Sequence, residues 1–136
     1  GLMGATTEYR FDGLDRSEKR LSQMIEQEYP SEFRQLVIQI AYELQGRVKE
    51  KTPRQTGRLQ DSWTVGKIQK RGDEYYIEVY TDVDYAEPVE YGHRKRGGKG
   101  FVQGHHMMEL SLEELSDRLP AFLQQWLNDF ISTHDL

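Results

Sequence analysis

The chain has 136 residues with 18 basic and 23 acidic side chains, so its formal net charge is −5. This length suits a single domain, since domains of about 100–150 residues are the commonest. The absence of cysteine excludes a disulfide scaffold, a thiolate zinc site and a cysteine nucleophile. No apolar run approaches the roughly 18 residues that a membrane-spanning helix needs, so no membrane partner is expected.

The charge is arranged in blocks along the chain. Residues 82–91 carry a net charge of −4 and residues 105–136 carry −5, the latter including Glu113, Glu114 and Asp117. Between them, residues 92–104 carry +4, from Arg94, Lys95, Arg96 and Lys99. A basic segment of this kind can bind phosphates or an acidic protein surface.

Two helices are predicted before residue 52. Residues 1–13 are polar and glycine-rich and are expected to form a flexible arm, with a single domain over 14–136. Helix-spaced apolar residues predict a first helix over 14–28, which Tyr29-Pro30 ends. The second helix is expected over 31–51, with Ser31 as its N-cap and one apolar stripe: Phe33, Leu36, Val37, Ile40, Ala41, Leu44 and Val48.

Strands are predicted in the middle of the chain. Alternating aromatic and β-branched residues over 61–81 indicate a hairpin, with Gly72-Asp73 as its turn. Ala86–Tyr91 is expected to form a short strand. Residues 92–104 contain five glycines and are expected to form a long flexible loop that carries the basic cluster.

A final helix is predicted over 106–132. Its apolar residues keep one helical phase across Pro120, which should therefore kink the helix without ending it. Ser111 and Glu114 have capping-box spacing, which places the start of regular helix near Ser111. The expected fold is therefore α+β: a small antiparallel sheet, made of the hairpin 61–81 and one or two short strands, packed against the long N-terminal and C-terminal helices.

No arrangement of residues predicts catalysis, a metal site or a cofactor. His93, His105 and His106 are the best metal candidates, but neighbouring residues on a helix point about 100° apart, so His105 and His106 would share a metal poorly. The serines match no nucleophile motif, and Gly97–Gly100 lacks the spacing of a phosphate-binding loop. We therefore expect a protein that is not an enzyme.

Three stretches in order resemble a phage morphogenesis family, the minor tail or head–tail joining proteins of the HK97 gene-product-ten type. Residues 52–63 are similar to its TP-x-x-TG-x-L-x-x-S signature, and Tyr85–Gly92 is similar to its YA-x-x-VE-x-G stretch. A basic glycine-rich loop then leads into the C-terminal helix, but Gly104-His105-His106-Met107 replaces the usual proline and phenylalanine. The residues that carry the resemblance are Thr52, Pro53, Thr56, Gly57, Leu59, Tyr85, Ala86, Glu90 and Gly92.

These motif residues also have local interpretations. Pro53 should end the second helix, Thr56 should bond to its own backbone in a turn, and Gly57 should supply a backbone angle that other residues avoid. Leu59 and Trp63 should anchor the first strand to the core. Glu90 is expected to pair with Arg58 or with a neighbouring subunit.

The resemblance implies a structural virion protein made in the bacterial host cytoplasm. Such proteins form rings, commonly six-fold, that join the capsid connector to the tail tube around a channel for DNA. From the charge blocks we add that Arg94, Lys95, Arg96 and Lys99 should dock on the last helix of the next subunit, at Glu113, Glu114 and Asp117.

Two alternatives stay open. The first is a nucleic-acid-binding module that uses residues 94–99 and stacks bases on Tyr91 or Phe101. The second is a metal-dependent hydrolase that uses Asp82, Asp84, Glu90 and His93. The net charge of −5 disfavours the first, and the lack of a convergent motif disfavours the second.

Overall fold

The computed structural model describes residues 16–72 and 74–135, and the arm expected over 1–13 lies outside them. Its helices are α1 (Arg16–Glu28), α2 (Pro30–Lys51), the 3-10 turn η1 (Arg54–Thr56), α3 (Gly57–Ser62), α4 (Ala86–Tyr91) and α5 (Met107–Thr133). Its strands are β1 (Thr64–Val65), β2 (Gln69–Arg71), β3 (Glu74–Tyr76), β4 (Val79–Tyr80), β5 (Gly92–Arg94) and β6 (Phe101–Gln103). Long helices near both ends and small antiparallel sheets confirm the predicted α+β class.

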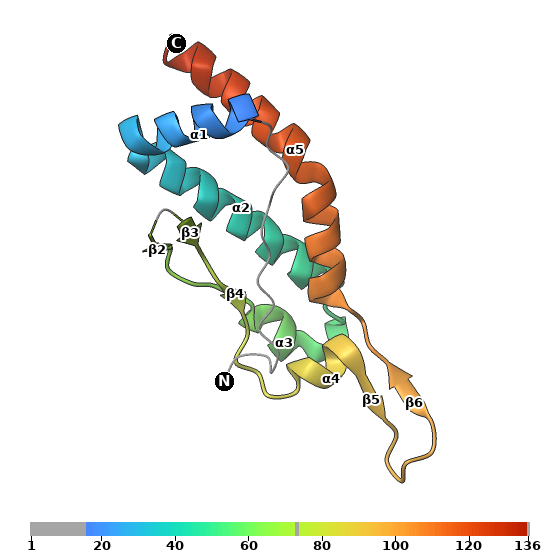
Figure 1. Cartoon of the computed structure of the whole chain (residues 1–136). Coiled ribbons are helices and arrows are strands. Elements are labelled where there is room, and N and C mark those ends of the chain that lie inside the picture. Colours follow the sequence, from blue (N-terminus) through green and yellow to red (C-terminus); the bar gives the residue numbers. More distant parts are fainter. Residues whose placement is uncertain (1–15, 73, 136) are drawn as a thin grey trace.

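The helices α2 and α5 lie side by side and form the long axis of the molecule (Figure 1). They run antiparallel, because Arg47 near the end of α2 bonds to Glu114 near the start of α5, while Glu32 bonds to His134 at the opposite end. The helix α1 packs across α2 beyond a corner at Tyr29 (Figure 1). The two long helices therefore form the framework of the molecule.

The corner between α1 and α2 differs from prediction by one detail. Tyr29 separates the helices as expected, but Tyr29 and not Ser31 is the N-cap of α2, with Pro30 in its first turn. Proline suits this place, because the first turn of a helix leaves its N–H groups without helical partners. The helix therefore begins one residue earlier than predicted.

Two hydrophobic clusters lie at opposite ends of the helix pair. The first surrounds Trp63 and comprises Val48, Leu59, Trp63, Val83, Ala86 and Met107. The second comprises Ile25, Leu127 and Phe130, with aromatic neighbours that include Tyr29, Phe33 and Trp126. Since α5 supplies Met107 to one cluster and Phe130 to the other, it holds the two ends of the molecule together.

The central hairpin is present but interrupted. The outer strands β2 and β3 pair with Arg71 opposite Glu74, and β1 pairs with β4 nearer the core with Val65 opposite Val79. Gly72 has a φ of +61°, as a tight turn requires, while Asp73 lies outside the described residues. Residues 61–62 belong to α3, so the strands begin at Thr64 and not at residue 61.

The stretch 86–91 is helix α4, so the strand predicted there was wrong. Ala86 and Val89 pack toward the Trp63 cluster with the three-residue spacing of a helix. Pro88 lies in the first turn, where its missing N–H costs nothing, and Glu87 complements the helix dipole there. Six residues are too few for the helical period to stand out in the sequence.

The helix α5 runs unbroken from Met107 to Thr133 with Pro120 inside it, and it bends along its length (Figure 1). A start at Ser111 was wrong. Ser111 is fully buried, and its hydroxyl donates to the carbonyl of Met107 one turn earlier. Among the described residues, no helix is long and apolar enough to cross a membrane.

Candidate functional site

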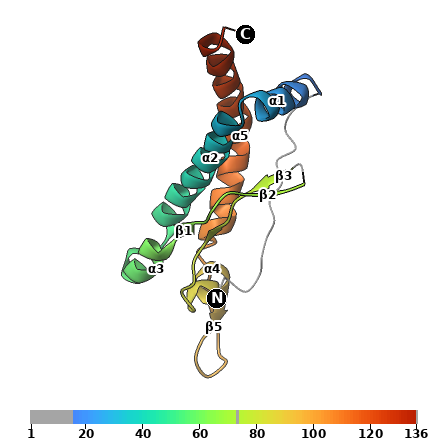
Figure 2. The same ribbon diagram turned by 90° about the vertical axis from the view of Figure 1, so that its left-hand side faces the viewer.

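The candidate site lies in residues 85–110, which form the short helix α4, a projecting hairpin and the start of α5. The strands β5 and β6 pair antiparallel, with Gly92 opposite Gln103 and Arg94 opposite Phe101. This hairpin, residues 92–103, is called the arm from here on, and the word no longer refers to residues 1–13. It extends away from the helices in both views (Figures 1 and 2). An irregular loop was expected over 92–104, and the pairing of its two ends corrects that prediction.

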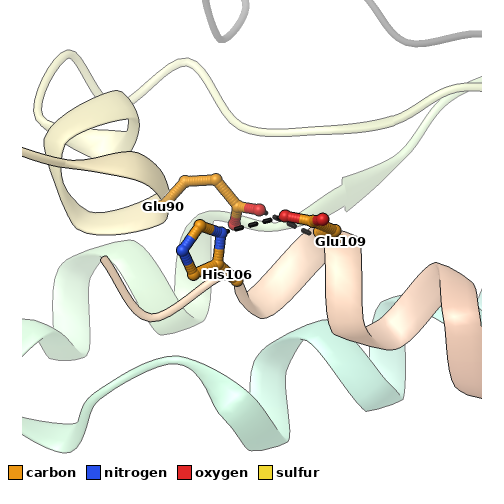
Figure 3. A group of neighbouring side chains, drawn as sticks. All are labelled: Glu90, His106 and Glu109. Atoms are coloured by element: carbon orange, nitrogen blue, oxygen red, sulfur yellow. Dashed lines mark hydrogen bonds and ion pairs between the residues drawn. The ribbon is translucent and has the colours of Figure 1, made fainter. Parts of the chain in front are cut away.

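Glu90 fixes the arm to the start of α5. Its side chain is 1 % exposed, and its two carboxylate oxygens accept the backbone N–H groups of Met108 at 2.9 Å and Glu109 at 3.1 Å. Figure 3 shows this carboxylate reaching from α4 toward the first turn of α5. The first N–H groups of a helix need acceptors, and a negative charge there is favourable. Glu90 thus serves as the cap of α5, and the predicted pairing with Arg58 was wrong.

His106 makes this outside cap necessary. It is the residue before α5, with a φ of +46°, and its side chain makes no capping hydrogen bond. Its ring Nδ1 lies instead 2.9 Å from a carboxylate oxygen of Glu109. Because His106 leaves the helix start without a local acceptor, α5 depends on a residue from α4.

The base of the arm requires glycine at two positions. A Cβ on Gly104 would lie 2.3 Å from the carbonyl oxygen of Glu90, and one on Gly92 would lie 2.4 Å from that of Val102. Gly92 also has a φ of +88°, which other residues rarely adopt. Backbone bonds from His105 to Val89 and from His106 to Glu90 complete the joint. Only bare backbone fits this close approach.

The tip of the arm is ordered by its own backbone. Lys95 N–H donates to the carbonyl of Gly100, and Gly98 N–H donates to that of Lys95. The tip carries exposed Lys95, Arg96 and Lys99, and Arg94 is exposed on β5. The apolar side chains of Phe101 and Val102 are 49 % and 39 % exposed. The arm thus presents cations and apolar surface to whatever lies next to it.

The predicted acidic residues of α5 separate into two groups. Glu114 faces α2, where it binds Arg47 at 2.8 Å and Lys51 at 2.7 Å. The hydrogen bond from Lys51, with the charges of both cations, holds the pKa of Glu114 below its usual value. Glu113 and Asp117 are exposed and lie outside every ion pair found among the described residues.

Donor atoms of Glu90, His106 and Glu109 lie within 4.8 Å of one another (Figure 3), a spacing that a metal could bridge. Both oxygens of Glu90 already accept helix N–H groups, and the positive end of α5 points at them, which disfavours a cation. Asp82, Asp84 and His93 do not join this group in the described part of the chain. The arrangement fits capping better than metal-dependent hydrolysis.

The first motif forms the joint between α2 and the central hairpin. Thr52 caps the end of α2, where its hydroxyl donates to the Val48 carbonyl at 2.6 Å and accepts the Trp63 indole N–H at 3.0 Å. Helix α2 ends before Pro53 as predicted, and Leu59 and Trp63 are buried beneath it. This joint is a packing unit, so the motif residues have an architectural role.

Two details of that motif differ from expectation or lie outside the description. Gly57 has a φ of −53° at the start of α3, which is an ordinary helical angle, so the special backbone angle predicted for it was wrong. The side chain of Thr56 lies outside the described part of the chain. Tyr85 is the N-cap of α4, and Ala86 is buried below it.

Sequence reasoning located the arm and the motif residues but missed the role of Glu90. A glutamate 18 residues before its partner gives no local capping signal. Tyr91, proposed for base stacking, is 44 % exposed beside this site. Partial burial, and then the charges of Glu90, Glu87 and Glu109, raise the pKa of its phenol.

Comparison with known families adds an independent finding. The family model described as "Bacteriophage HK97-gp10, putative tail-component" matches residues 15–92, which include α1 to α4 and both motif stretches. No curated protein and no solved structure matches the chain. The match covers more than half of the sequence, so the chain belongs to the HK97-gp10-like family of phage proteins.

Proposed function

We propose that the protein is a structural, non-enzymatic subunit of a phage or prophage particle. In this proposal it forms a ring at the head–tail junction, or at the head-proximal end of the tail, and joins the capsid connector to the tail tube. It is made in the host cytoplasm and ends in the virion. The observation that carries the proposal is membership of a phage tail-component family.

The geometry supports a structural role in two ways. Two buried polar side chains hold elements together: Glu90 caps α5, and Thr52 joins α2 to Trp63. The arm, in contrast, presents charge and apolar surface away from the body (Figure 2). A fixed body with one projecting contact element suits a subunit that meets its neighbours on a particle.

Solution mass across a wide concentration range tests the ring, by light scattering and native mass spectrometry followed by negative-stain imaging. Closed oligomers, six-fold ones above all, are the expected result. Growth with concentration into filaments would contradict a closed ring. Monomers at every concentration, with no ring in the images, would contradict self-assembly of the free subunit.

A second candidate function is nucleic-acid binding by the same arm. The observation that favours it is the clustering of Arg94, Lys95, Arg96 and Lys99 beside exposed Phe101, which combines cations with a surface for base stacking. It predicts duplex or single-stranded DNA affinity that falls steeply with salt, because neutralised phosphates release counterions. The acidic remainder of the chain would repel the same DNA.

A further inference from the structure

We propose that the arm of one subunit docks on the outer face of α5 in a second copy of this chain. The acidic face is defined here as Glu109, Glu113 and Asp117, together with the exposed Leu110. The inference rests on the proposed function, since it supplies the contact between neighbouring subunits of the ring. It replaces Glu114, which was predicted to join this contact, with Glu109.

The cations of the arm have no ion-pair partner in the described part of their own chain. Arg94, Lys95, Arg96 and Lys99 take part in none of the ion pairs found among residues 16–72 and 74–135. Both views show the arm extending from the start of α5 in the direction opposite to the course of that helix (Figures 1 and 2). The tip therefore points away from the acidic face of its own chain and is available to another chain.

The acidic face has the spacing of a single helix surface. Glu109, Glu113 and Asp117 follow one another at intervals of four residues, which places them in one row along α5. All three are exposed. Of the three, only Glu109 has a side-chain hydrogen-bond partner among the described residues, the imidazole of His106. Glu114, one residue after Glu113, points to the other side and is held by Arg47 and Lys51.

Apolar surface accompanies charge on both sides of the proposed contact. On the arm, Phe101 and Val102 are exposed, and on α5 Leu110, the residue after Glu109, is 44 % exposed. A two-stranded hairpin is marginally stable alone in water, so burial of an exposed side chain such as Phe101 in the contact would stabilise the arm. Each side of the proposed contact thus combines exposed apolar surface with charge of one sign, positive on the arm and negative on α5.

The geometry of this contact is head-to-tail. The arm and the acidic face are different surfaces, so each subunit offers one of each. Such heterologous contacts generate a ring where the rotation closes and a filament where it does not. Salt should weaken the contact, because it screens the attraction between exposed charges, with a Debye length of about 10 Å at 0.1 M ionic strength.

Cysteine cross-linking tests the contact directly, because the natural chain contains no cysteine. Lys99→Cys marks the tip while three of the arm's four cations remain. Ala121→Cys marks the exposed position one turn beyond Asp117 and keeps all the acids. The control, Ser132→Cys, is exposed on the same helix about 16 Å further on, at 1.5 Å per residue. Each pair is mixed and treated with a short bis-maleimide.

Efficient hetero-cross-linking of the Lys99→Cys and Ala121→Cys chains, and little with Ser132→Cys, is the expected result. Reversal of Glu113 and Asp117 to lysine should reduce the cross-link about tenfold or more, since like charges oppose each other across the contact. Reversal to glutamate of Arg94, Lys95 and Arg96, the arm cations that remain in the Lys99→Cys chain, should do the same. A mixture of the two reversed chains should restore it, because every arm again meets a face of opposite charge.

Equal cross-linking at Ser132→Cys, or none with either partner at high protein concentration, would overturn the docking proposal. So would an arm that binds DNA with a steep salt dependence and gives no cross-link. Rings that form normally from the charge-reversed chains would overturn the docking and leave the proposed function standing. Specific cross-links without any ring would uphold the docking and count against the ring.

Discussion

The carboxylate of Glu90 accepts the backbone N–H of Met108 at 2.9 Å, so a residue of α4 caps a helix that begins beyond the arm. The two residues stand 18 positions apart, and the arm lies between them. Glu90 and Gly92, both part of the second family motif, thus determine how the arm leaves the body. The motif can be understood as the joint of a projecting hairpin.

Replacement of Glu90 should destabilise the protein more than its position on a short helix suggests. Glu90→Ala leaves two part-buried N–H groups without acceptors and should cost about 2–3 kcal/mol of unfolding free energy. Glu90→Gln keeps one acceptor oxygen and should cost less. Urea unfolding measures both, with Glu87→Gln on the same helix as the control. A loss below about 0.5 kcal/mol for Glu90→Ala would show that Glu90 does not cap α5.

Substitution of the glycines at the base of the arm, Gly92 and Gly104, should destabilise the protein for a reason that does not apply to the tip glycines. Gly104→Ala would place a methyl group 2.3 Å from the Glu90 carbonyl oxygen, so we expect a loss of more than about 2 kcal/mol. Gly98→Ala also meets a positive φ of +76°, but its Cβ would meet nothing within 4 Å. It should cost only about 1–2 kcal/mol. Thermal denaturation with hydrogen exchange at the His105 and His106 amides compares the two, and equal effects would contradict the close approach.

Stability should depend on pH through His134. The Phe130 carbonyl and then the Glu32 carboxylate raise the pKa of this imidazole above its ordinary 6.5, because both accept hydrogen bonds from the protonated ring. Its contribution is therefore complete below 6.5 and is lost as the pH rises through the elevated folded pKa. The variant His134→Phe keeps a ring stacked on Phe130 but does not titrate.

Unfolding of the natural chain and His134→Phe across pH 5–9 isolates that contribution. The natural chain should lose its advantage on the alkaline side, and Glu32→Gln should move the loss toward lower pH. An advantage that grew with pH would contradict the assigned bonds. NMR titration of the His134 ring checks the direction of the pKa shift independently.

The ion pairs of Glu114 with α2 should give stability the opposite pH dependence to that of His134. Lys51 and Arg47 hold the pKa of Glu114 below its ordinary 4.5, so its contribution is present above that value and is lost as the pH falls through the lowered pKa. Glu114→Gln should therefore destabilise the protein at neutral pH but not at strongly acidic pH. Glu113→Gln, which removes an exposed carboxylate next to it, should change little at either. Acid titrations of unfolding free energy separate the two, and equal losses would refute the pairing.

The sequence was sufficient for those elements whose pattern is long. The stripe from Phe33 to Val48 spans several helical turns, and the alternation around Tyr75 to Val79 matches the strand period, so the presence of α2 and of the hairpin was predicted correctly. The six residues of α4 are too short for either period to decide. Glu90 could not be assigned its partner, because that depends on where the chain returns after the arm.

The different surroundings of the acidic residues on α5 could not be predicted from the sequence pattern either. Glu113 and Glu114 are neighbours with the same chemistry, and only the packing of α5 on α2 directs one to Arg47 and the other to solvent. A charge count along the chain treats them alike. The arm, in contrast, could be located from its glycines and cations, although its strand pairing could not.

The joint at Gly92 and Gly104 also separates what can vary in this chain from what cannot. Residues between Lys95 and Gly100 bond only to one another in the backbone bonds of the turn, so insertions, deletions or reversed charge there would leave the body's packing intact. The positions at the base allow no side chain at all. Evolution can therefore refit the arm to a different neighbour by altering its length and charge, at little risk to the fold that carries it.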